Sequence, residues 1–205
     1  MVELQTQFKM KKIYGLIIPI VLFAFISCGD NGEKTSKEDL LSDAKKLETG
    51  VYTPLDYNDG LVSEISLLQV AYAKVDQMMQ EDAFDLNNDS FFERYNKAHQ
   101  NFVNECMRIK SVLNKLSPIG ERGTEYKEIS IQCVDAYASL GELIDAENLK
   151  EIINTQNELQ YSSIDMAYMI VDQSENTYIE MNRNYAIANG ITLGEAVDID
   201  ELAKE

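Results

Sequence analysis

Apolar side chains recur along most of this chain at alternating intervals of three and four residues, which is the spacing of one helix face. The repeat is clearest between about Asp59 and Glu81, where it continues for three heptads. It predicts an amphipathic helix whose apolar side packs against other helices. The two apolar rows of this helix are Leu61, Leu68 and Val75, and Ile65, Tyr72 and Met79.

Three more stretches carry the same repeat. A second helix is expected after the polar turn at 85–90, and it ends before the helix-breaking Pro118 and Gly120. The third begins near Thr124. The fourth ends at Asn189-Gly190, and an acidic tail trails beyond it.

Two shorter segments are less regular. Ser36 and Asp39 have the spacing of a capping box and predict a short helix, which the stretch from Gly50 to Pro54 ends. From Asp145 to Gln160 the sequence suits a helix, but the pattern does not locate its break.

The fold class follows from these segments. No run of β-branched residues alternates with polar ones over a useful length. Four amphipathic helices of about 25–30 residues, joined by short turns, predict an all-α fold in residues 51–205: an antiparallel up-down four-helix bundle about 40 Å long. The alternative is a three-helix arrangement in which one helix is broken.

The N-terminal segment has a different character. From Ile13 to Ile26 the chain is uncharged, but a helix that spans a bilayer needs about 20 apolar residues. Lys11 and Lys12 before this run and a polar, acidic segment after it are typical of a secretory signal peptide. Because Glu3 is unusual in such a leader, translation from Met10 would give a cleaner signal than translation from Met1.

The leader ends in Phe25-Ile26-Ser27-Cys28, which resembles the lipobox of bacterial lipoproteins, with Phe25 where leucine is usual. The resemblance implies that residues 1–27 are removed, that Cys28 carries acyl chains such as palmitate, and that residues 28–50 form a tether with a short helix. Two or three acyl chains would make the attachment to membrane lipid durable. The alternatives are an uncleaved anchor helix and a conventionally secreted protein.

The charge of the chain excludes one class of partner. The formal net charge is −17, and removal of residues 1–27, with three lysines and one glutamate, leaves about −19. Such a surface repels phosphate backbones, so we expect no nucleic-acid partner. It also disfavours docking onto anionic lipid by charge, which leaves anchoring to the acyl group.

Two further cysteines lie on apolar rows. If the second turn is centred between Ile119 and Gly120, Cys106 and Cys133 are equally far from it along two antiparallel helices, and they lie at the same level. In an oxidising compartment they are candidates for a disulfide, which would contribute roughly 3.5 kcal/mol in the chain-entropy model. The alternative is a pair of buried free thiols.

The remaining polar motifs favour structural roles over catalysis. His99, the only histidine, lies on a core row at the level of Tyr72, and a hydrogen bond between them would satisfy both. Asp85, Asn87 and Asp89 have calcium-loop spacing, but Ser90 and Asn96 stand where glycine and glutamate belong, so helix capping explains them better. We therefore expect no metal site, no cofactor and no enzymatic activity.

Tyrosines are abundant on the core rows. Their hydroxyl groups need partners, and two arrangements would provide them: a polar cavity that admits a small ligand, or rings at the rim of the core with wet hydroxyls. The six tyrosines on or beside the rows are Tyr72, Tyr95, Tyr126, Tyr137, Tyr178 and Tyr185.

A further resemblance covers the whole chain. The lipobox, Tyr57-Asn58-Asp59 at the opening of the first helix, and Tyr185-Ala186 with Asn189-Gly190-Ile191 at the end of the last resemble a family of bacterial surface lipoproteins of the Bacteroidota and spirochaete type. Asp30 and Glu33 also resemble a surface-export signal. The resemblance implies a lipid-anchored protein of the outer membrane or cell surface.

Two functions remain open from the sequence. The favoured one is a non-catalytic helical module that binds an envelope protein while acylated Cys28 holds it to membrane lipid. The alternative is a carrier of a small ligand in a tyrosine-lined interior.

Overall fold

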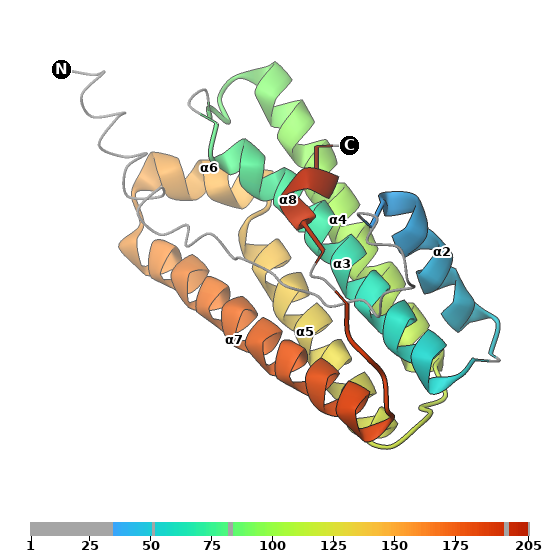
Figure 1. Ribbon diagram of the computed structural model, residues 1–205. Helices are drawn as coiled ribbons and strands as arrows, with labels where there is room; N and C mark the ends of the chain where they lie inside the picture. Colours follow the sequence, from blue (N-terminus) through green and yellow to red (C-terminus); the bar gives the residue numbers. More distant parts are fainter. Residues whose placement is uncertain (1–34, 51, 82–83, 195–196, 205) are drawn as a thin grey trace.

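The computed structural model describes residues 35–50, 52–81, 84–194 and 197–204 of the chain (Figure 1). Within these ranges the chain forms the helices α2 to α8 and no strand. The predicted all-α class is therefore confirmed. The signal peptide predicted at 1–27 and the first part of the tether predicted at 28–50 lie outside the described residues.

The first described helix, α2 (Lys37–Glu48), begins where the sequence predicts. The Ser36 hydroxyl oxygen accepts a hydrogen bond from the backbone N–H of Asp39, and the Asp39 carboxylate accepts one from the N–H of Ser36. This reciprocal capping box satisfies two amide groups that an open helix end would leave without partners.

The helix α3 (Pro54–Met79) begins five residues before its predicted start at Asp59. A second capping box causes the difference. Thr53 Oγ1 accepts from the N–H of Asp56 at 3.2 Å, and the Asp56 carboxylate accepts from the N–H of Thr53 at 3.0 Å. Pro54 suits the first helical position, because the amide hydrogen that it lacks would have no partner there.

The polar cluster at 85–90 caps the next helix, α4 (Asp89–Lys115), as predicted. Asn88 Oδ1 accepts a hydrogen bond from the N–H of Phe91 at 3.1 Å. After the turn, α5 (Gly123–Leu143) runs back along the molecule. Gly120 in this turn has a φ of +77°, a left-handed conformation that glycine adopts at little steric cost.

The break that the sequence left unplaced between 145 and 160 lies at Gln156. This residue ends α6 (Ala146–Thr155) in a left-handed conformation, with a φ of 55°. Asn157 then begins α7 (Glu158–Ala188), because its side-chain oxygen accepts from the N–H groups of Leu159 and Gln160.

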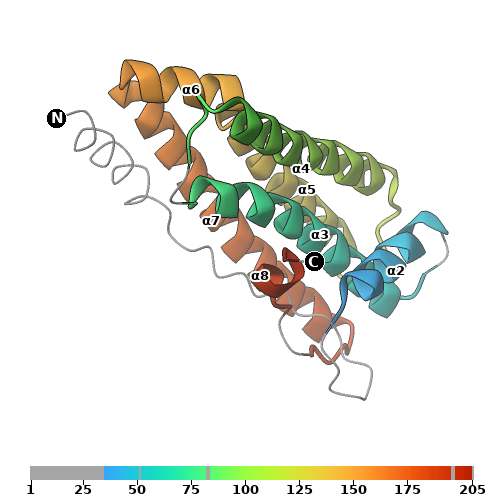
Figure 2. The same cartoon turned by 90° about the horizontal axis from the view of Figure 1, so that it is seen from above.

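Four long helices, α3, α4, α5 and α7, lie side by side, and α6 lies across one end of them (Figures 1 and 2). The helix α4 packs against α3 and α5, and α5 packs in turn against α7. On the other side of α3 lie α2 and α8 (Ile199–Leu202). Because α3 contacts α2, α4, α5, α7 and α8, it is the central element of this helical bundle.

One continuous apolar core fills the space between the long helices. The two apolar rows predicted for α3, from Leu61 to Val75 and from Ile65 to Met79, are both part of it. The core is unusually rich in tyrosine. Its largest enclosed side chains include Tyr57, Tyr95, Tyr126, Tyr137, Tyr178, Tyr185 and Phe102.

The C-terminal segment corrects one expectation. It was predicted to trail away from the fold, but Val197, Ile199 and Leu202 are buried in a second apolar cluster with α2 and α3. The prediction was wrong because the acidic residues 198, 200 and 201 alternate with these three apolar residues and make the segment look wholly polar. In the structure, α8 covers part of α3 that the long helices leave open (Figure 2).

The contact between α2 and α3 depends on a glycine. A Cβ atom built at Gly60 would lie 2.4 Å from Cγ of Leu47, which is itself buried. Because the Leu47 side chain has no open space to move into, Gly60 sets how closely α2 approaches α3.

We expect Gly60→Ala to lower the free energy of unfolding by about 1–3 kcal/mol, because overpacking outweighs the better helix propensity of alanine. Urea denaturation followed by circular dichroism measures the change. In a Leu47→Ala background, where the clash is absent, the same substitution should cost nothing. An equal cost in both backgrounds would show that the contact with Leu47 is not the cause.

Candidate functional site

The predicted site residues fall into two groups. Cys28, on which the lipoprotein prediction depends, lies outside the described residues. Cys106 and His99 on α4 and Cys133 on α5 are all buried between the long helices. The structure therefore gives the surroundings of the three buried residues, whereas lipidation of Cys28 stays a prediction.

Cys106 and Cys133 are free thiols in the structure. Burial raises the pKa of the Cys106 thiol to about 12, and it also raises that of Cys133, to which the Cys106 thiol adds a smaller effect. Both residues belong to the apolar core between the long helices. A disulfide in the exported protein stays a prediction.

His99 is a satisfied core residue, but its partner differs from the predicted one. Its Nε2–H donates to the carbonyl oxygen of Gly141 at 2.7 Å. The Tyr72 hydroxyl instead lies 3.5 Å from Oδ1 of Asp76, one turn along its own helix. The predicted Tyr72–His99 bond is wrong, because the His99 ring faces α5 rather than Tyr72 on α3.

The tyrosine hydroxyls lie inside the fold and find protein partners there. Tyr95 donates to the carbonyl oxygen of Ile144 at 2.7 Å, and Tyr185 donates to that of Ile119 at 2.9 Å. The expectation of rings at the rim with wet hydroxyls is wrong, because α5, α6 and α7 close over them.

Two of these tyrosines belong to a polar chain that crosses the core. The hydroxyls of Tyr126 and Tyr178 are 3.1 Å apart. The side-chain amide of Asn182 on α7 donates both to the Tyr126 hydroxyl and to Oδ1 of Asn58 on α3, each at 2.9 Å. The chain joins α3, α5 and α7 through groups that the apolar repeat does not reveal.

A carboxyl group lies at the centre of the same three helices. Glu175 on α7 is buried, and it accepts hydrogen bonds from the Tyr137 hydroxyl on α5 and from the side-chain amide of Gln69 on α3, the latter at 3.5 Å. Burial raises the pKa of Glu175 to about 8, although the bonds from Tyr137 and Gln69 oppose the shift. At neutral pH the group is therefore mostly protonated.

Sequence analysis missed Glu175, although a signal was present. Glu175 lies four residues after Val171 and three before Tyr178, so it occupies a core position of the α7 repeat. Its neighbours Gln69 and Tyr137 come from other helices, and no local pattern identifies them. Among the residues that the structure describes, no group of three or more His, Cys, Asp or Glu side chains is placed to hold a metal ion.

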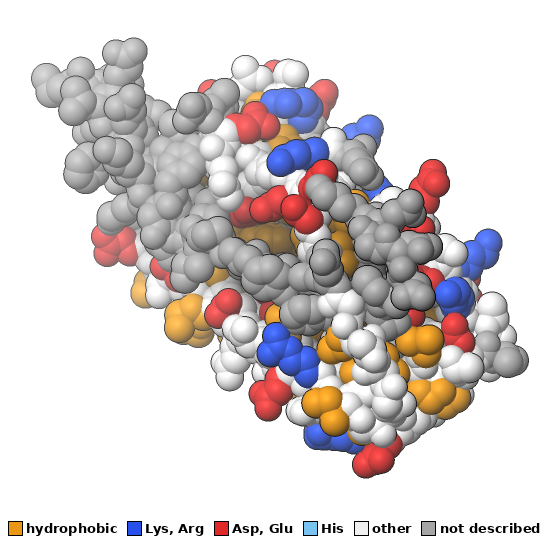
Figure 3. Space-filling model, in the orientation of Figure 1, with side chains coloured by type: hydrophobic (Ala, Val, Ile, Leu, Met, Phe, Trp, Pro, Cys, Tyr) orange, Lys and Arg blue, Asp and Glu red, His pale blue; other side chains and the backbone are white. Residues whose placement is uncertain are grey.

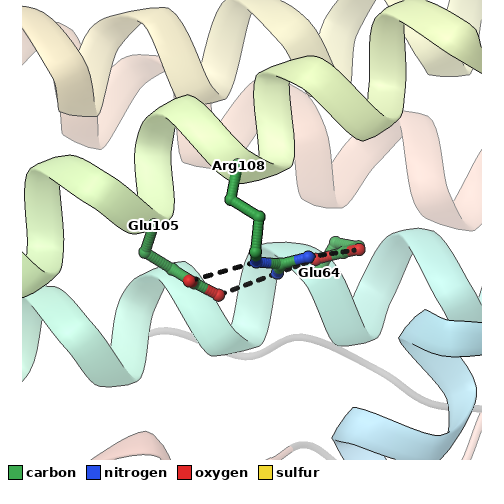
Figure 4. A network of polar contacts seen from close by, with 3 residues as sticks. All are labelled: Glu64, Glu105 and Arg108. Carbon is green, nitrogen blue, oxygen red and sulfur yellow. Dashed lines mark hydrogen bonds and ion pairs between the residues drawn. The ribbon is translucent and has the colours of Figure 1, made fainter.

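A second buried carboxylate joins α3 to α4. Arg108 on α4 bonds to both carboxylate oxygens of Glu64, which is fully buried on α3, and also contacts Glu105 one turn away at 2.7 Å (Figure 4). The cost of burying Glu64 still raises the pKa of its carboxyl group, and the bidentate arginine opposes that effect. The Glu64–Arg108 pair thus links α3 to α4, and Glu105 holds the arginine from its own helix.

The outer side of α7 is apolar although it faces solvent. Leu159, Met166, Met169 and Ile170 expose 81%, 60%, 69% and 51% of their surface. Their spacing places them on one side of the first four turns, away from the buried row of α7. Figure 3 shows hydrophobic side chains at the surface along the edge that α7 forms. We call these four residues the α7 outer face.

A groove of about 410 Å³ between α5 and α7 continues this face. Ile129 and Ala136 of α5 and Ile170 of α7 are its apolar lining, and Ile170 also belongs to the α7 outer face. The other lining residues are Gln132, Asp135, Ser139, Gln173, Ser174 and Thr177. The groove lies on the outside of the α5–α7 pair, so it is separate from the tyrosine-rich core.

Comparison with protein-family models, with curated proteins and with solved structures finds no match to this chain. In the described part of the chain, no helix combines the length and the apolar character that crossing a bilayer requires.

Glu175 makes stability depend on pH. In the unfolded chain this group loses its proton near pH 4.5, whereas the folded protein holds it to about pH 8. The protonated Glu175 therefore makes its full contribution to the free energy of unfolding below pH 4.5, and this contribution is lost as the pH rises towards 8. We expect Glu175→Gln, which stays neutral, to stabilise the protein at pH 8 by about 1–3 kcal/mol and much less at pH 5.

Urea denaturation of both proteins at the two pH values measures this effect. Glu180→Gln is the matched control, because Glu180 is an exposed acidic residue on the same helix and does not contribute to the raised pKa of Glu175. A difference between wild type and Glu175→Gln that does not change with pH would contradict the assignment.

The disulfide prediction has a direct test. We expect the exported protein, analysed by intact mass spectrometry without reduction, to be lighter by two hydrogens than the reduced chain, and Cys133→Ala to remove the difference. An unreduced mass equal to the reduced mass would leave Cys106 and Cys133 as buried thiols.

Proposed function

We propose that this chain is a lipoprotein of the bacterial outer membrane or cell surface, whose helical bundle is a non-catalytic binding module for an envelope partner. Acylated Cys28 holds the module to membrane lipid after residues 1–27 are removed. The support for the anchor is the lipobox-like Phe25-Ile26-Ser27-Cys28. The proposed arrangement of the four long helices is an antiparallel up-down bundle.

The observation that carries the binding role is the α7 outer face. A soluble surface rarely gathers several large apolar side chains unless they contact another molecule. Folding does not require them there, because α7 already contributes a separate buried row with Val171 and Tyr178 to the core. A second apolar side on one helix is therefore best explained by a partner.

The helix α2 bears on how far the module stands from the lipid. Leu40 and Leu47 of α2 are buried against the rest of the fold. The stretch left to span from lipid to fold is thus about residues 28–36, and nine residues reach at most about 30 Å. We propose that the module works close to the membrane that holds it.

The alternative of a small-ligand carrier has less support. That alternative assumed that the tyrosine hydroxyls need a ligand as their polar partner. Four of them instead have hydrogen-bond partners within the protein: Tyr95, Tyr126, Tyr137 and Tyr185. The groove beside α7 has no tyrosine in its lining.

Anchoring is tested on the full chain in a bacterial host. We expect wild type to incorporate labelled palmitate and to enter the detergent phase of Triton X-114, because acyl chains on Cys28 carry it there. Cys28→Ala should take up no label and retain the uncleaved leader.

The matched control is Cys133→Ala, which removes a cysteine elsewhere and should leave labelling unchanged. Labelling that persists in Cys28→Ala would refute Cys28 as the acylated residue. Protease treatment of intact cells then separates an external location, in which the bundle is digested, from a periplasmic one.

A further inference from the structure

The α7 outer face and the groove beside it form one elongated surface. From Leu159 to Thr177 they follow α7 for about 27 Å, at 1.5 Å per residue. A partner helix of about 18 residues has the same length. Helices bind to such surfaces by placing apolar side chains at intervals of three and four residues into a groove.

The charge around this surface restricts what can approach it. Apart from the buried Glu175, the two helices that form it, α5 and α7, carry eight acidic side chains and only two basic ones, Lys127 and Arg183. Glu128 and Glu142 on α5 and Glu180 on α7 are exposed. An occupant with positive side chains beside its apolar stripe would be attracted, whereas an acidic occupant would be repelled.

Two other occupants fit these charges poorly. A second copy of the chain without residues 1–27 would bring another net charge of about −19 and the same acidic helices to the interface. Anionic lipid would meet the same repulsion. A basic amphipathic helix matches both the apolar and the acidic character of the surface.

We infer that the α7 outer face and the α5–α7 groove bind an amphipathic α-helix of a partner protein, with Lys or Arg residues flanking its apolar stripe. The inference rests on the binding role proposed above and specifies its partner. Met166 and Met169 suit this role, because methionine side chains adapt to the shape of different apolar partners.

The test uses the full chain in phosphatidylcholine nanodiscs and a fluorescent synthetic peptide of about 18 residues. The peptide has leucines at intervals of three and four, and lysines elsewhere. A matched peptide carries glutamate in place of every lysine. Fluorescence anisotropy measures binding of each, with empty nanodiscs as the background.

We expect the lysine peptide to bind at least tenfold more tightly than the glutamate peptide, and its affinity to fall as salt rises from about 50 to about 500 mM. The double substitution Met166→Gln with Ile170→Gln should weaken binding at least tenfold without changing any charge. Since both side chains are more than half exposed, we expect this variant to fold, and circular dichroism verifies that it does.

Met107→Gln is the matched control, because Met107 is an apolar residue of α4 with the same 60% exposure as Met166. It should leave binding unchanged. Equal binding of the two peptides, or binding unaffected by the double substitution, would overturn the inference. Self-association in analytical ultracentrifugation that the double substitution abolishes would overturn it in favour of a second copy.

Failure of the anchor and failure of this surface can be distinguished. The Cys28→Ala chain, in the same nanodiscs, should bind the lysine peptide with unchanged affinity, since Cys28 is not part of the surface. Loss of palmitate labelling alone therefore tests the anchor, and loss of peptide binding in the double variant tests the surface.

Discussion

The enclosure of α3 is the constraint on which the rest of the fold depends. Every residue from 57 to 70 on this helix is buried. A helix enclosed on all sides must either be entirely apolar or find partners for its polar groups. Three buried polar side chains of α3 find such partners: Asn58 bonds to Asn182, Glu64 to Arg108, and the Gln69 amide nitrogen to Glu175. The hydroxyls of Ser63 and Ser66 have no hydrogen-bond partner among the described residues.

These polar contacts determine how the neighbouring helices align with α3. An apolar row alone tolerates sliding by one turn, since leucine, isoleucine and valine pack in many ways. A buried carboxylate such as Glu64 has no such freedom, because loss of its arginine would leave a charge without compensation. The contact with Arg108 therefore fixes α4 against α3, and those of Asn182 and Glu175 fix α7.

Features that depend on residues close together in the sequence could be predicted. The cap at Ser36 and the turn before α4 depend on residues within three positions of one another, and both were predicted. The start of α3 was missed by five residues, because Thr53 and Asp56 form a capping box that the apolar repeat does not include. Contacts between distant segments, such as that of His99 with Gly141, could not be predicted, because they depend on how α3, α4 and α5 lie relative to one another.

The two sides of α7 illustrate the limit of the apolar pattern as a guide to function. Its buried row was predicted, because burial in the core explains every third or fourth residue. Met166 and Ile170 have the same spacing, rotated around the helix, and they look like core residues until the positions of the other helices are known. Only the absence of a described helix over that side distinguishes them.

An apolar side that the fold leaves exposed lowers solubility, and a strongly acidic chain can tolerate it because like charges keep its copies apart. In the binding role that we propose, the same acidity favours a basic partner over a second copy, so the charge that permits the exposed face would also select its partner.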